Sequence, residues 1–558
     1  MLLRWARSRA RHTRALARLY SGLGTGSSGY KECDVVIVGG GPAGLAFASA
    51  LAANKALDGS VKVTLVEGGD LDKVRDWEMP PDAFSNRVVS LTNASQDFLD
   101  EIGAWVHLDA ERTCPIEDMQ VWDGISDARI DFSAAALGLG RGKGSSQMAR
   151  LTETLNLQRG LLQHLSGQSN ITLLDSTKVE NIFSDDIPGG GWPVVQLSNG
   201  NVLRARLLVG ADGINSPVRS YSKIDSYGWD YNTRAIVATL LHPPRIFPAF
   251  LPTGPIAFLP LSDTASSLVW STTPALAAVL TKADPAILAG MINAAFRLPE
   301  RSVRFLHRRL LEQPSLSPED LRTEIAFREQ AHTIAPHSAY ASATINPEDA
   351  SVGIPPHGAE ALPPLVASIQ PGTIASFPLR LRHAEEYIGS RTVLIGDAAH
   401  IVHPLAGQGL NLGLGDAAAL ARCVSTALAL GGDIGSRTAL TPYARERYFE
   451  NHKVMSAVDK LHKLYASTAP PVVWARSTGL EVLNELDTIK AGIVGAAGGQ
   501  SSARAGAGLF WDTVASGVET LVGGARVAEA VGSGLQSVAG GILQQLARAA
   551  AGPENDRR

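Results

Sequence analysis

The chain has few of the residues that would point to several common protein classes. Only three of its 558 residues are cysteines, too isolated for a zinc site, a redox dithiol or a disulfide framework: Cys33, Cys114 and Cys423. A net charge of only −4 gives no basic excess, so we expect no nucleic acid partner. No uninterrupted apolar run reaches the roughly 18 residues of a membrane span, so any membrane contact is expected to be peripheral.

Acidic residues are missing from the start of the chain. Residues 1–30 contain six arginines and no Asp or Glu, and the first acidic residue is Glu32. A basic, acid-free and helix-compatible segment followed by Gly and Ser is typical of a mitochondrial transit peptide. The alternative is a disordered basic arm.

The segments that are present favour an α/β fold. The apolar run 34–38, DVVIV, is followed by glycines, by the Ala-rich stretch 43–54 and by a second apolar run, VKVTLVE. This order predicts a strand, turn, helix and strand in a parallel sheet covered on both faces. Much later, RTVLIGD and a helix beginning near Gly409 predict a second nucleotide-binding half.

Between these halves the pattern changes. Residues 227–300 hold strand-like segments punctuated by proline, which predicts a separate sheet. Residues 299–378 carry many prolines and few long periodic runs, so we expect insertion loops there. The Gly/Ala-rich tail 491–552 has apolar residues at helical spacing, which favours amphipathic helices.

One glycine motif indicates a dinucleotide site. Gly39, Gly41 and Gly44 stand between the first strand and its helix, and Glu67 ends the next strand. The glycines allow a tight turn, close approach of pyrophosphate and close helix–strand packing, while the acid can bind ribose hydroxyls. The motif alone leaves NAD and FAD open.

Two later motifs favour FAD. LLVGADGINSPVRS contains Asp212-Gly213, and VLIGDAAHIVHPLAGQGLN contains Gly396-Asp397. With the glycine motif, they resemble the class A flavoprotein aromatic hydroxylases. The resemblance implies that Asp397 holds the FAD ribitol, that Gly396 allows close backbone approach, and that Asp212 contacts FAD and in some members pyridine nucleotide.

Two further segments carry the same resemblance. NRVVSLTNASQDFL contains Arg87, implied to contact the adenosine side of FAD, and LNLQRGLL contains Gln158, implied to contact the flavin. Their alternatives are a solvated surface charge and a helix-surface amide. Thr154 departs from the pattern, which has Asn there.

The chain is similar, over residues 31–495, to the ubiquinone-biosynthesis hydroxylases, in particular to the mitochondrial branch acting at ring position C5. SFPLRLRHAEEYI, SLVWST and LNELDTIKAGI add to the segments above. The resemblance implies a Rossmann-like, para-hydroxybenzoate-hydroxylase-like FAD domain with an inserted substrate domain on a β-sheet. The expected divisions are a transit peptide at 1–30, an FAD domain at 31–112, 148–225 and 379–470, a substrate domain at 113–147 and 226–378, and a helical region with its tail at 471–558.

The resemblance also implies the chemistry. Backbone amides near Gly407, Gly409 and Asn411 would stabilise negative charge on reduced flavin, and Pro404 would shape the wall where oxygen reacts. A flavin C4a-hydroperoxide would then hydroxylate a polyprenylated phenol. His403 is a candidate for proton handling. No metal is expected, because His403 and its neighbour His400 lack further ligands.

The sequence shows no second glycine turn for NADPH. The glycines of 138–146 fit a mobile loop better than a phosphate site. The resemblance implies electrons from a ferredoxin and its reductase, and partners among other ubiquinone-biosynthesis proteins in a membrane-associated complex on the matrix side of the inner membrane. The alternatives are an NADPH-dependent hydroxylase of a small soluble phenolic acid and a non-enzymatic prenyl-lipid escort protein.

Overall fold

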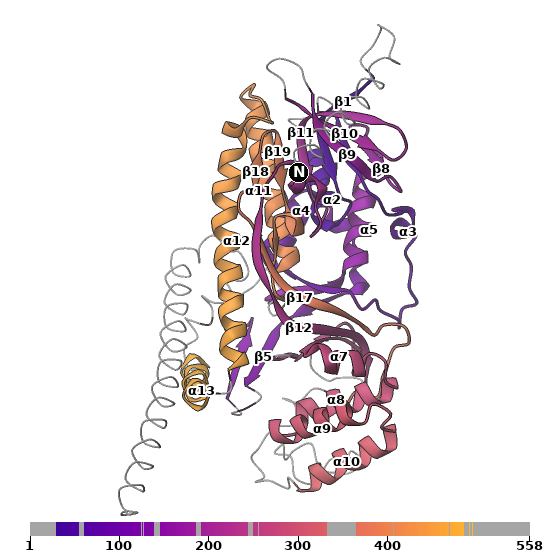
Figure 1. The fold of residues 1–558 in the computed structure, drawn as a ribbon, viewed down its shortest axis with the longest axis vertical. Coiled ribbons are helices and arrows are strands. Elements are labelled where there is room, and N and C mark those ends of the chain that lie inside the picture. Colours follow the sequence, from indigo (N-terminus) through magenta and orange to yellow (C-terminus); the bar gives the residue numbers. More distant parts are fainter. Residues whose placement is uncertain are drawn as a thin grey trace, which may run out of the picture.

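The computed structural model describes residues 29–484, apart from gaps at 55–60, 124, 126–127, 139–145, 186–190, 244–248, 255, 332–363, 405–406 and 468, together with residues 490 and 494. The expected transit peptide, the 138–146 loop and the Gly/Ala-rich tail lie wholly or largely outside the described residues. Figure 1 shows two sheets stacked along the long axis, with helices around them.

The first sheet has a parallel centre. Its strands run in the order β18-β19-β11-β1-β2-β8, and the hairpin β9-β10 joins β11. β19, β11, β1, β2 and β8 are parallel neighbours, whereas β18 and β10 pair antiparallel. The strands are β1 (Lys31–Val38), β2 (Val63–Val66), β8 (Ile171–Leu174), β9 (Val179–Ser184), β10 (Pro193–Leu197), β11 (Val202–Gly210), β18 (Ile388–Gly389) and β19 (Thr392–Leu394).

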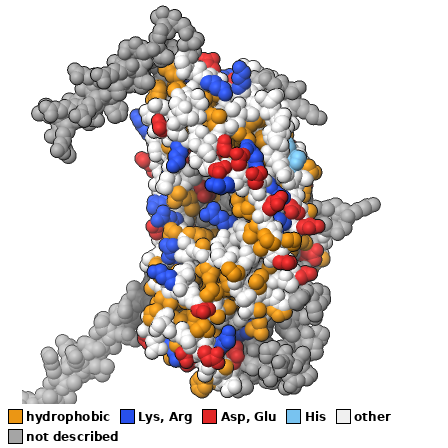
Figure 2. All heavy atoms as spheres, turned by 90° about the vertical axis from the view of Figure 1, so that its right-hand side faces the viewer, with side chains coloured by type: hydrophobic (Ala, Val, Ile, Leu, Met, Phe, Trp, Pro, Cys, Tyr) orange, Lys and Arg blue, Asp and Glu red, His pale blue; other side chains and the backbone are white. Residues whose placement is uncertain are grey.

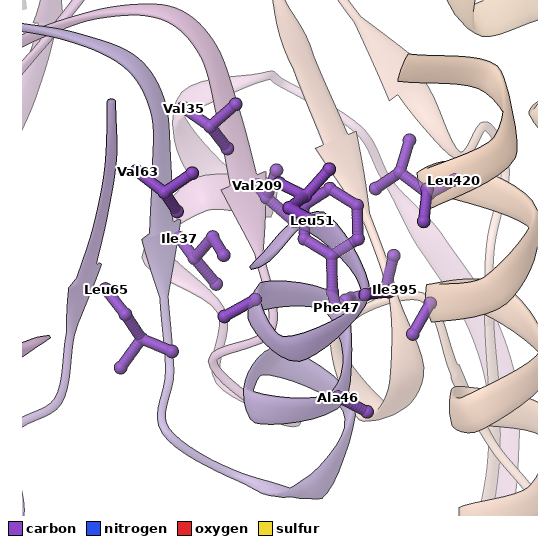
Figure 3. Close-up of a cluster of buried hydrophobic side chains, with 14 of the residues drawn as sticks. Val35, Ile37, Ala46, Phe47, Leu51, Val63, Leu65, Val209, Ile395 and Leu420 are labelled. Atoms are coloured by element: carbon purple, nitrogen blue, oxygen red, sulfur yellow. The ribbon is translucent and has the colours of Figure 1, made fainter. Parts of the chain in front are cut away.

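The core of this sheet forms where helices cover its strands. α2 (Pro42–Ala53) contacts both α5 (Thr154–Leu165) and α11 (Gly409–Ala429). Figure 3 shows Phe47 and Leu51 of α2 between the strand residues Ile37 and Val209 and Leu420 of α11. All five side chains are buried, so this apolar layer holds the two distant halves of the sheet together.

α11 is also the described helix that is long and apolar enough, by length and composition alone, to cross a membrane. Its most apolar window is 56% buried inside the protein, and Asp416 and Arg422 interrupt its sequence. Its contacts with α2 and α12 (Arg437–Ala466) are those of a core helix.

The second sheet is mostly antiparallel. Its strands run in the order β20-β17-β12-β15-β14-β13-β5-β6, and β16 pairs with β12. They are β5 (Asp118–Asp123), β6 (Arg129–Ser133), β12 (Ser226–Leu241), β13 (Ala249–Gly254), β14 (Ile256–Pro260), β15 (Ala265–Thr272), β16 (Ser368–Ile369), β17 (Ala375–Ala384) and β20 (His400–Ile401). The long strands β12 and β17 extend from this sheet toward the first (Figure 1).

Four helices cover one side of the second sheet at the lower end of Figure 1: α7 (Pro274–Leu280), α8 (Pro285–Arg297), α9 (Glu300–Glu312) and α10 (Pro318–Ala331). The prediction of insertion loops is therefore wrong for residues 300–331. Two of the prolines that suggested loops, Pro299 and Pro318, stand at helix beginnings, where a missing N–H costs nothing. On α9, the side chains of Leu306 and Leu310 are buried.

A small third sheet, β3-β7-β4, connects the two larger ones. It consists of β3 (Val88–Thr92), β4 (Thr113–Ile116) and β7 (Ala149–Glu153), with α4 (Asn93–Glu101) following β3. The long helix α12 runs along the left side of Figure 1, beside both large sheets. α13 (Pro470–Asn484) packs near β6. On the face drawn in Figure 2, acidic and basic side chains lie close together, so this face has a mixed charge.

Candidate cofactor site

The glycine turn has the geometry that its spacing predicts. Gly39 has a φ of +112°, and a Cβ there would lie 2.2 Å from the Ala211 carbonyl oxygen. A Cβ on Gly44 would lie 2.1 Å from the Gly39 oxygen, so both positions require glycine. A Cβ on Gly41, in contrast, would meet nothing within 4 Å. The turn is therefore packed on its inner side and open at Gly41, where helix α2 begins without a side-chain cap.

Glu67 and Gln158 both contact this turn. The Glu67 carboxylate accepts hydrogen bonds from the amides of Gly40 at 2.5 Å and Gly69 at 2.6 Å. The Gln158 side chain donates from Nε2 to the Gly40 carbonyl at 3.2 Å. Each contact leaves further hydrogen-bonding capacity on the side chain, so both residues brace the turn and can still face a ligand.

Asp212 lies directly beside the glycine turn, since a Cβ on Gly39 would be 2.9 Å from its backbone nitrogen. Its Oδ2 accepts from the Val218 amide at 3.1 Å, while Oδ1 is buried with no hydrogen-bond partner among the described residues. Burial raises the pKa of this carboxyl group, against the opposing effect of Ser216. An orphaned buried oxygen at this position fits a missing donor such as a ligand hydroxyl.

The third motif forms a short 3-10 turn, Gly396–Ala398. Gly396 has a φ of +59°, and a Cβ there would lie 3.1 Å from the Cβ of Ala43, near the beginning of α2. Asp397 is exposed, and no donor from the described residues reaches its carboxylate. Nevertheless, desolvation by the surrounding protein raises the pKa of the Asp397 carboxyl group, while the electrostatic effect of His400 partly lowers it. The Asp397 side chain thus reaches the surface while much of the surrounding protein lies close to it.

The segment before α11 carries the remaining predicted residues. Pro404 and Gly407 close a turn through the Gly407 amide at 3.0 Å, and Gly407 has a φ of +62°. α11 then begins at Gly409 without a side-chain cap, so its first amides are available to a negative charge.

Asn411 lies in the first turn of α11, and its side chain is engaged inside the protein. Its Oδ1 accepts from the Thr92 amide at 3.0 Å and from Ser95 Oγ at 2.8 Å. Its Nδ2 donates to the carbonyls of Ser90 at 2.7 Å and Gly407 at 3.2 Å. These four bonds use the whole side-chain amide, so only the Asn411 backbone can serve a cofactor.

His403 is completely buried and packs against two rings. Its ring centroid lies 4.9 Å from that of Tyr231 and 4.6 Å from that of His462. Burial, together with His462, lowers the pKa of His403 to about 4, so the imidazole is neutral at physiological pH. Arg87, just before β3, is exposed.

Sequence reasoning missed two parts of the site. Arg219 donates to the carbonyls of Ala398 at 2.8 Å and Ile214 at 2.6 Å, which joins the second motif to the third. Behind the third motif, a buried network centres on Asp416 of α11. Arg219 belongs to the second motif, LLVGADGINSPVRS, so the sequence contains some signal for it. Asp416 is a single Asp inside an apolar helix, and such a residue gives no comparable signal. The carboxylates of Asp70, Asp72 and the half-buried Asp175 also gather within 4.8 Å, and exposed acidic groups commonly do so without a metal.

The three motifs therefore meet in one place although they span residues 39–411. The open Gly41, the unsatisfied Asp212 oxygen, the unpartnered Asp397 and the uncapped start of α11 all fit a long ligand with phosphates, hydroxyls and a ring that becomes negative. These features fit FAD.

Comparison with known proteins agrees. A family model described as an FAD binding domain matches residues 32–250 and 336–458. Among solved structures, the probable FAD-dependent monooxygenase PqsL of Pseudomonas aeruginosa superposes with a TM-score of 0.54 at 20% identity, covering 81% of this chain and 99% of PqsL. The p-nitrophenol 4-monooxygenase PnpA of Pseudomonas putida gives a TM-score of 0.56 at 17% identity, covering 83% and 97% of the two chains. The chain thus contains an FAD binding domain and shares the fold of these FAD-dependent monooxygenases.

Relatives that match most of the chain define the family further. The chain is 40% identical over 494 residues to the mitochondrial ubiquinone biosynthesis monooxygenase COQ6 of Saccharomyces cerevisiae, covering 86% of this chain and 97% of the relative. Its identity with human COQ6 is 35% over 479 residues, covering 84% and 92%. The chain belongs to the family of mitochondrial ubiquinone biosynthesis monooxygenases. FAD is its cofactor, and the expectation of a flavin monooxygenase is confirmed.

Proposed function

We propose that this protein hydroxylates ring position C5 of a polyprenylated 4-hydroxybenzoate-type precursor of ubiquinone, with O2 as the second substrate. The observation that carries the proposal is the identity of 40% across 97% of the yeast ubiquinone biosynthesis monooxygenase. Membership in a family of FAD monooxygenases excludes the escort protein. No observation favours a small soluble phenolic acid over the polyprenylated ring.

Each motif has a proposed task in holding FAD. The amides at Gly41 and the start of α2 would bind the pyrophosphate, and Glu67 would bind the adenosine ribose. Arg87 would contact the adenosine side. Asp397 would accept from the ribitol hydroxyls, and Asp212 would pair its orphaned oxygen with a cofactor hydroxyl.

Around the flavin ring the proposed residues are Gln158 and the segment 403–411. Bound FAD would supply the activation of dioxygen. The amides of Gly409 and Asn411 would stabilise negative charge at the start of α11, and Gly407 would shape the turn before them. Pro404 would form a wall without an N–H donor. Since His403 is neutral, we propose that it takes part through a neutral imidazole, as a hydrogen-bonding group beside Pro404.

The proposal extends to surroundings and domains. We propose electron supply by a ferredoxin and its reductase, as the resemblance to the mitochondrial ubiquinone-biosynthesis hydroxylases implies. We also propose peripheral attachment to the matrix side of the inner membrane, among other ubiquinone-biosynthesis proteins. The division into FAD and substrate domains remains as proposed, although its boundary at 378–379 falls inside β17.

Two spectroscopic measurements test this function. In the first, anaerobic protein lacking residues 1–30 receives NADPH and then ferredoxin with its reductase. Bleaching of the flavin band only with the ferredoxin system is expected, and rapid bleaching by NADPH alone would contradict the proposed donor. In the second, the flavin spectrum is titrated with a polyprenylated 4-hydroxybenzoate-type phenol and with 4-hydroxybenzoate itself. We expect the prenylated compound to perturb the spectrum at far lower concentration, and the reverse order would contradict the proposed substrate.

A further inference from the structure

A buried carboxylate lies directly behind the Gly396 turn. Oδ2 of Asp416, in α11, accepts hydrogen bonds from the Gly396 amide at 3.0 Å and from His400 Nε2 at 2.6 Å. Oδ1 accepts hydrogen bonds from Arg447 Nε at 2.8 Å and from Asn451 Nδ2 at 2.9 Å. His400, Arg447 and their hydrogen bonds lower the pKa of this fully buried carboxyl group to about 2, so Asp416 carries its negative charge at neutral pH. The carboxylate is thus fully engaged inside the protein.

The turn depends on contacts from outside itself. It has only three residues, and its first residue, Gly396, holds a positive φ of +59°. Asp416 binds the amide of this residue from the buried side, whereas the next residue, Asp397, faces outward with no donor from the described chain. The carboxylate therefore fixes the first peptide of the turn, one residue before the one that carries the Asp397 side chain.

The same carboxylate connects the turn to two long helices. Arg447 of α12 also donates to the Leu412 carbonyl of α11 at 3.2 Å. Room for its guanidinium comes from Gly415, where a Cβ would lie 2.8 Å from Arg447 Nη2. Asn451 reaches further, to the Tyr387 hydroxyl at 3.2 Å. α11, α12 and the turn are joined through one buried centre.

Stability alone does not require a charge here. A buried ion pair can often be exchanged for apolar residues at little cost or even with a gain in stability, because desolvation offsets the attraction. What apolar residues cannot provide is an acceptor for the Gly396 amide and the His400 ring together. This difference separates a positioning role from a packing role.

We propose that Asp416 is a positioning residue for FAD, which holds the Gly396 turn from behind so that Asp397 meets the ribitol of the cofactor. The proposal rests on FAD as cofactor and on the ribitol role proposed for Asp397, but not on the identity of the phenol. Its effect is seen in FAD affinity and in the flavin midpoint potential, because a misplaced turn changes the contacts of the cofactor in both redox states.

The test uses full-length protein stripped of FAD and reloaded. Removing the Asp416 charge alone leaves Arg447 as an uncompensated buried cation, and such a variant can fail to fold. The decisive variant is therefore Asp416→Leu with Arg447→Met, which removes both charges and the acceptor of the Gly396 amide. We expect its dissociation constant for FAD to rise at least tenfold and its flavin midpoint potential to shift, while the FAD-free variant still unfolds in one cooperative transition.

A matched control lies beyond the other end of α11. Asp433 pairs there with Arg391 at 2.6 Å, and Asp433→Leu with Arg391→Met should leave both FAD readouts unchanged. If the Asp416 double variant does not fold, His400→Phe removes one Oδ2 donor and leaves the ion pair, and a raised FAD dissociation constant is again expected. Wild-type affinity and potential in whichever variant folds would overturn the proposal. A wild-type protein that binds no flavin would instead contradict the cofactor itself.

Discussion

Arg219 donates a hydrogen bond from Nη1 to the carbonyl of Ala398 at 2.8 Å, although 179 positions separate the two residues. Its Nη2 donates to the Ile214 carbonyl at 2.6 Å. Ile214 follows Asp212 closely, and Ala398 follows Asp397 directly. One side chain thus sets the spacing between two motifs that we propose to hold FAD from different parts of the chain.

Replacing Arg219 should loosen this spacing. Arg219→Met leaves two carbonyls without a donor, so we expect a loss of about 1–3 kcal/mol in the free energy of unfolding and a tenfold or larger rise in the FAD dissociation constant. The control is Arg204→Met on β11, which breaks contacts with Asp185 and Glu32 away from the motifs. Both variants should lose stability, but only Arg219→Met should bind FAD more weakly. Equal FAD affinities would contradict the bridging role.

Two glycines of the first motif should respond differently to alanine. Gly39→Ala places a methyl group 2.2 Å from the Ala211 oxygen at a φ of +112°, so FAD-free protein should lose about 3 kcal/mol or more. Gly41→Ala meets nothing within 4 Å and should leave FAD-free stability nearly unchanged. It should still weaken FAD binding, because its methyl group occupies the proposed pyrophosphate position. Denaturation and FAD titration of both variants test this. Full FAD affinity in Gly41→Ala would refute the proposed position of the pyrophosphate.

The Arg476–Asp123 ion pair should anchor α13. Both side chains are at most 2% exposed, and the guanidinium binds the two carboxylate oxygens at 2.8 Å each. Arg476→Met leaves a buried carboxylate uncompensated, so we expect a loss of about 3–5 kcal/mol in the free energy of unfolding. Adding Asp123→Asn should recover much of that loss. As a surface control, Arg437→Met breaks an exposed pair with Glu386 and should cost less than about 1 kcal/mol. Similar losses for both arginines would rule out this anchoring.

Stability should fall as the medium becomes mildly acidic. Burial lowers the pKa of His307, His383 and His403 to about 4, whereas an unfolded histidine titrates near about 6.5. Their neutral forms thus contribute stability that is full above pH of about 6.5 and is lost as the pH falls toward about 4. Each adds a slope of up to about 1.4 kcal/mol per pH unit. His307→Gln should flatten the pH dependence measured by chemical denaturation, and an unchanged slope would show that His307 does not titrate in this way.

The parts of the site that the sequence predicted are those defined by local backbone geometry. Gly39 and Gly44 need glycine because of contacts set by a strand–turn–helix unit, and that need is visible as a short spacing. The meeting of the three motifs followed from their order. Helix α11 began at the expected Gly409 because Pro404 and the preceding glycines mark its start.

The parts that sequence reasoning missed depend on contacts between distant segments. Asp416 is bound by residues 16 to 35 positions away, and none of those spacings forms a motif. The Asn411 backbone amide was expected to serve the cofactor because of its place at a helix start, but the four bonds of its side chain, mostly to β3 and α4, left no signal in the sequence. Helices α9 and α10 were not predicted because the number of prolines suggested loops. Pro299 and Pro318 stand at helix starts, where proline is compatible with a helix.

The most direct test of the central claim is a single turnover with labelled oxygen. Protein with its flavin reduced anaerobically by dithionite is mixed with a polyprenylated 4-hydroxybenzoate-type phenol and ¹⁸O2, and the product is analysed by mass spectrometry and NMR. Chemical reduction makes the result independent of the natural electron donor. We predict one ¹⁸O atom in a new hydroxyl group at ring position C5. Flavin reoxidation without labelled prenylated product, together with labelling of soluble 4-hydroxybenzoate, would contradict the account.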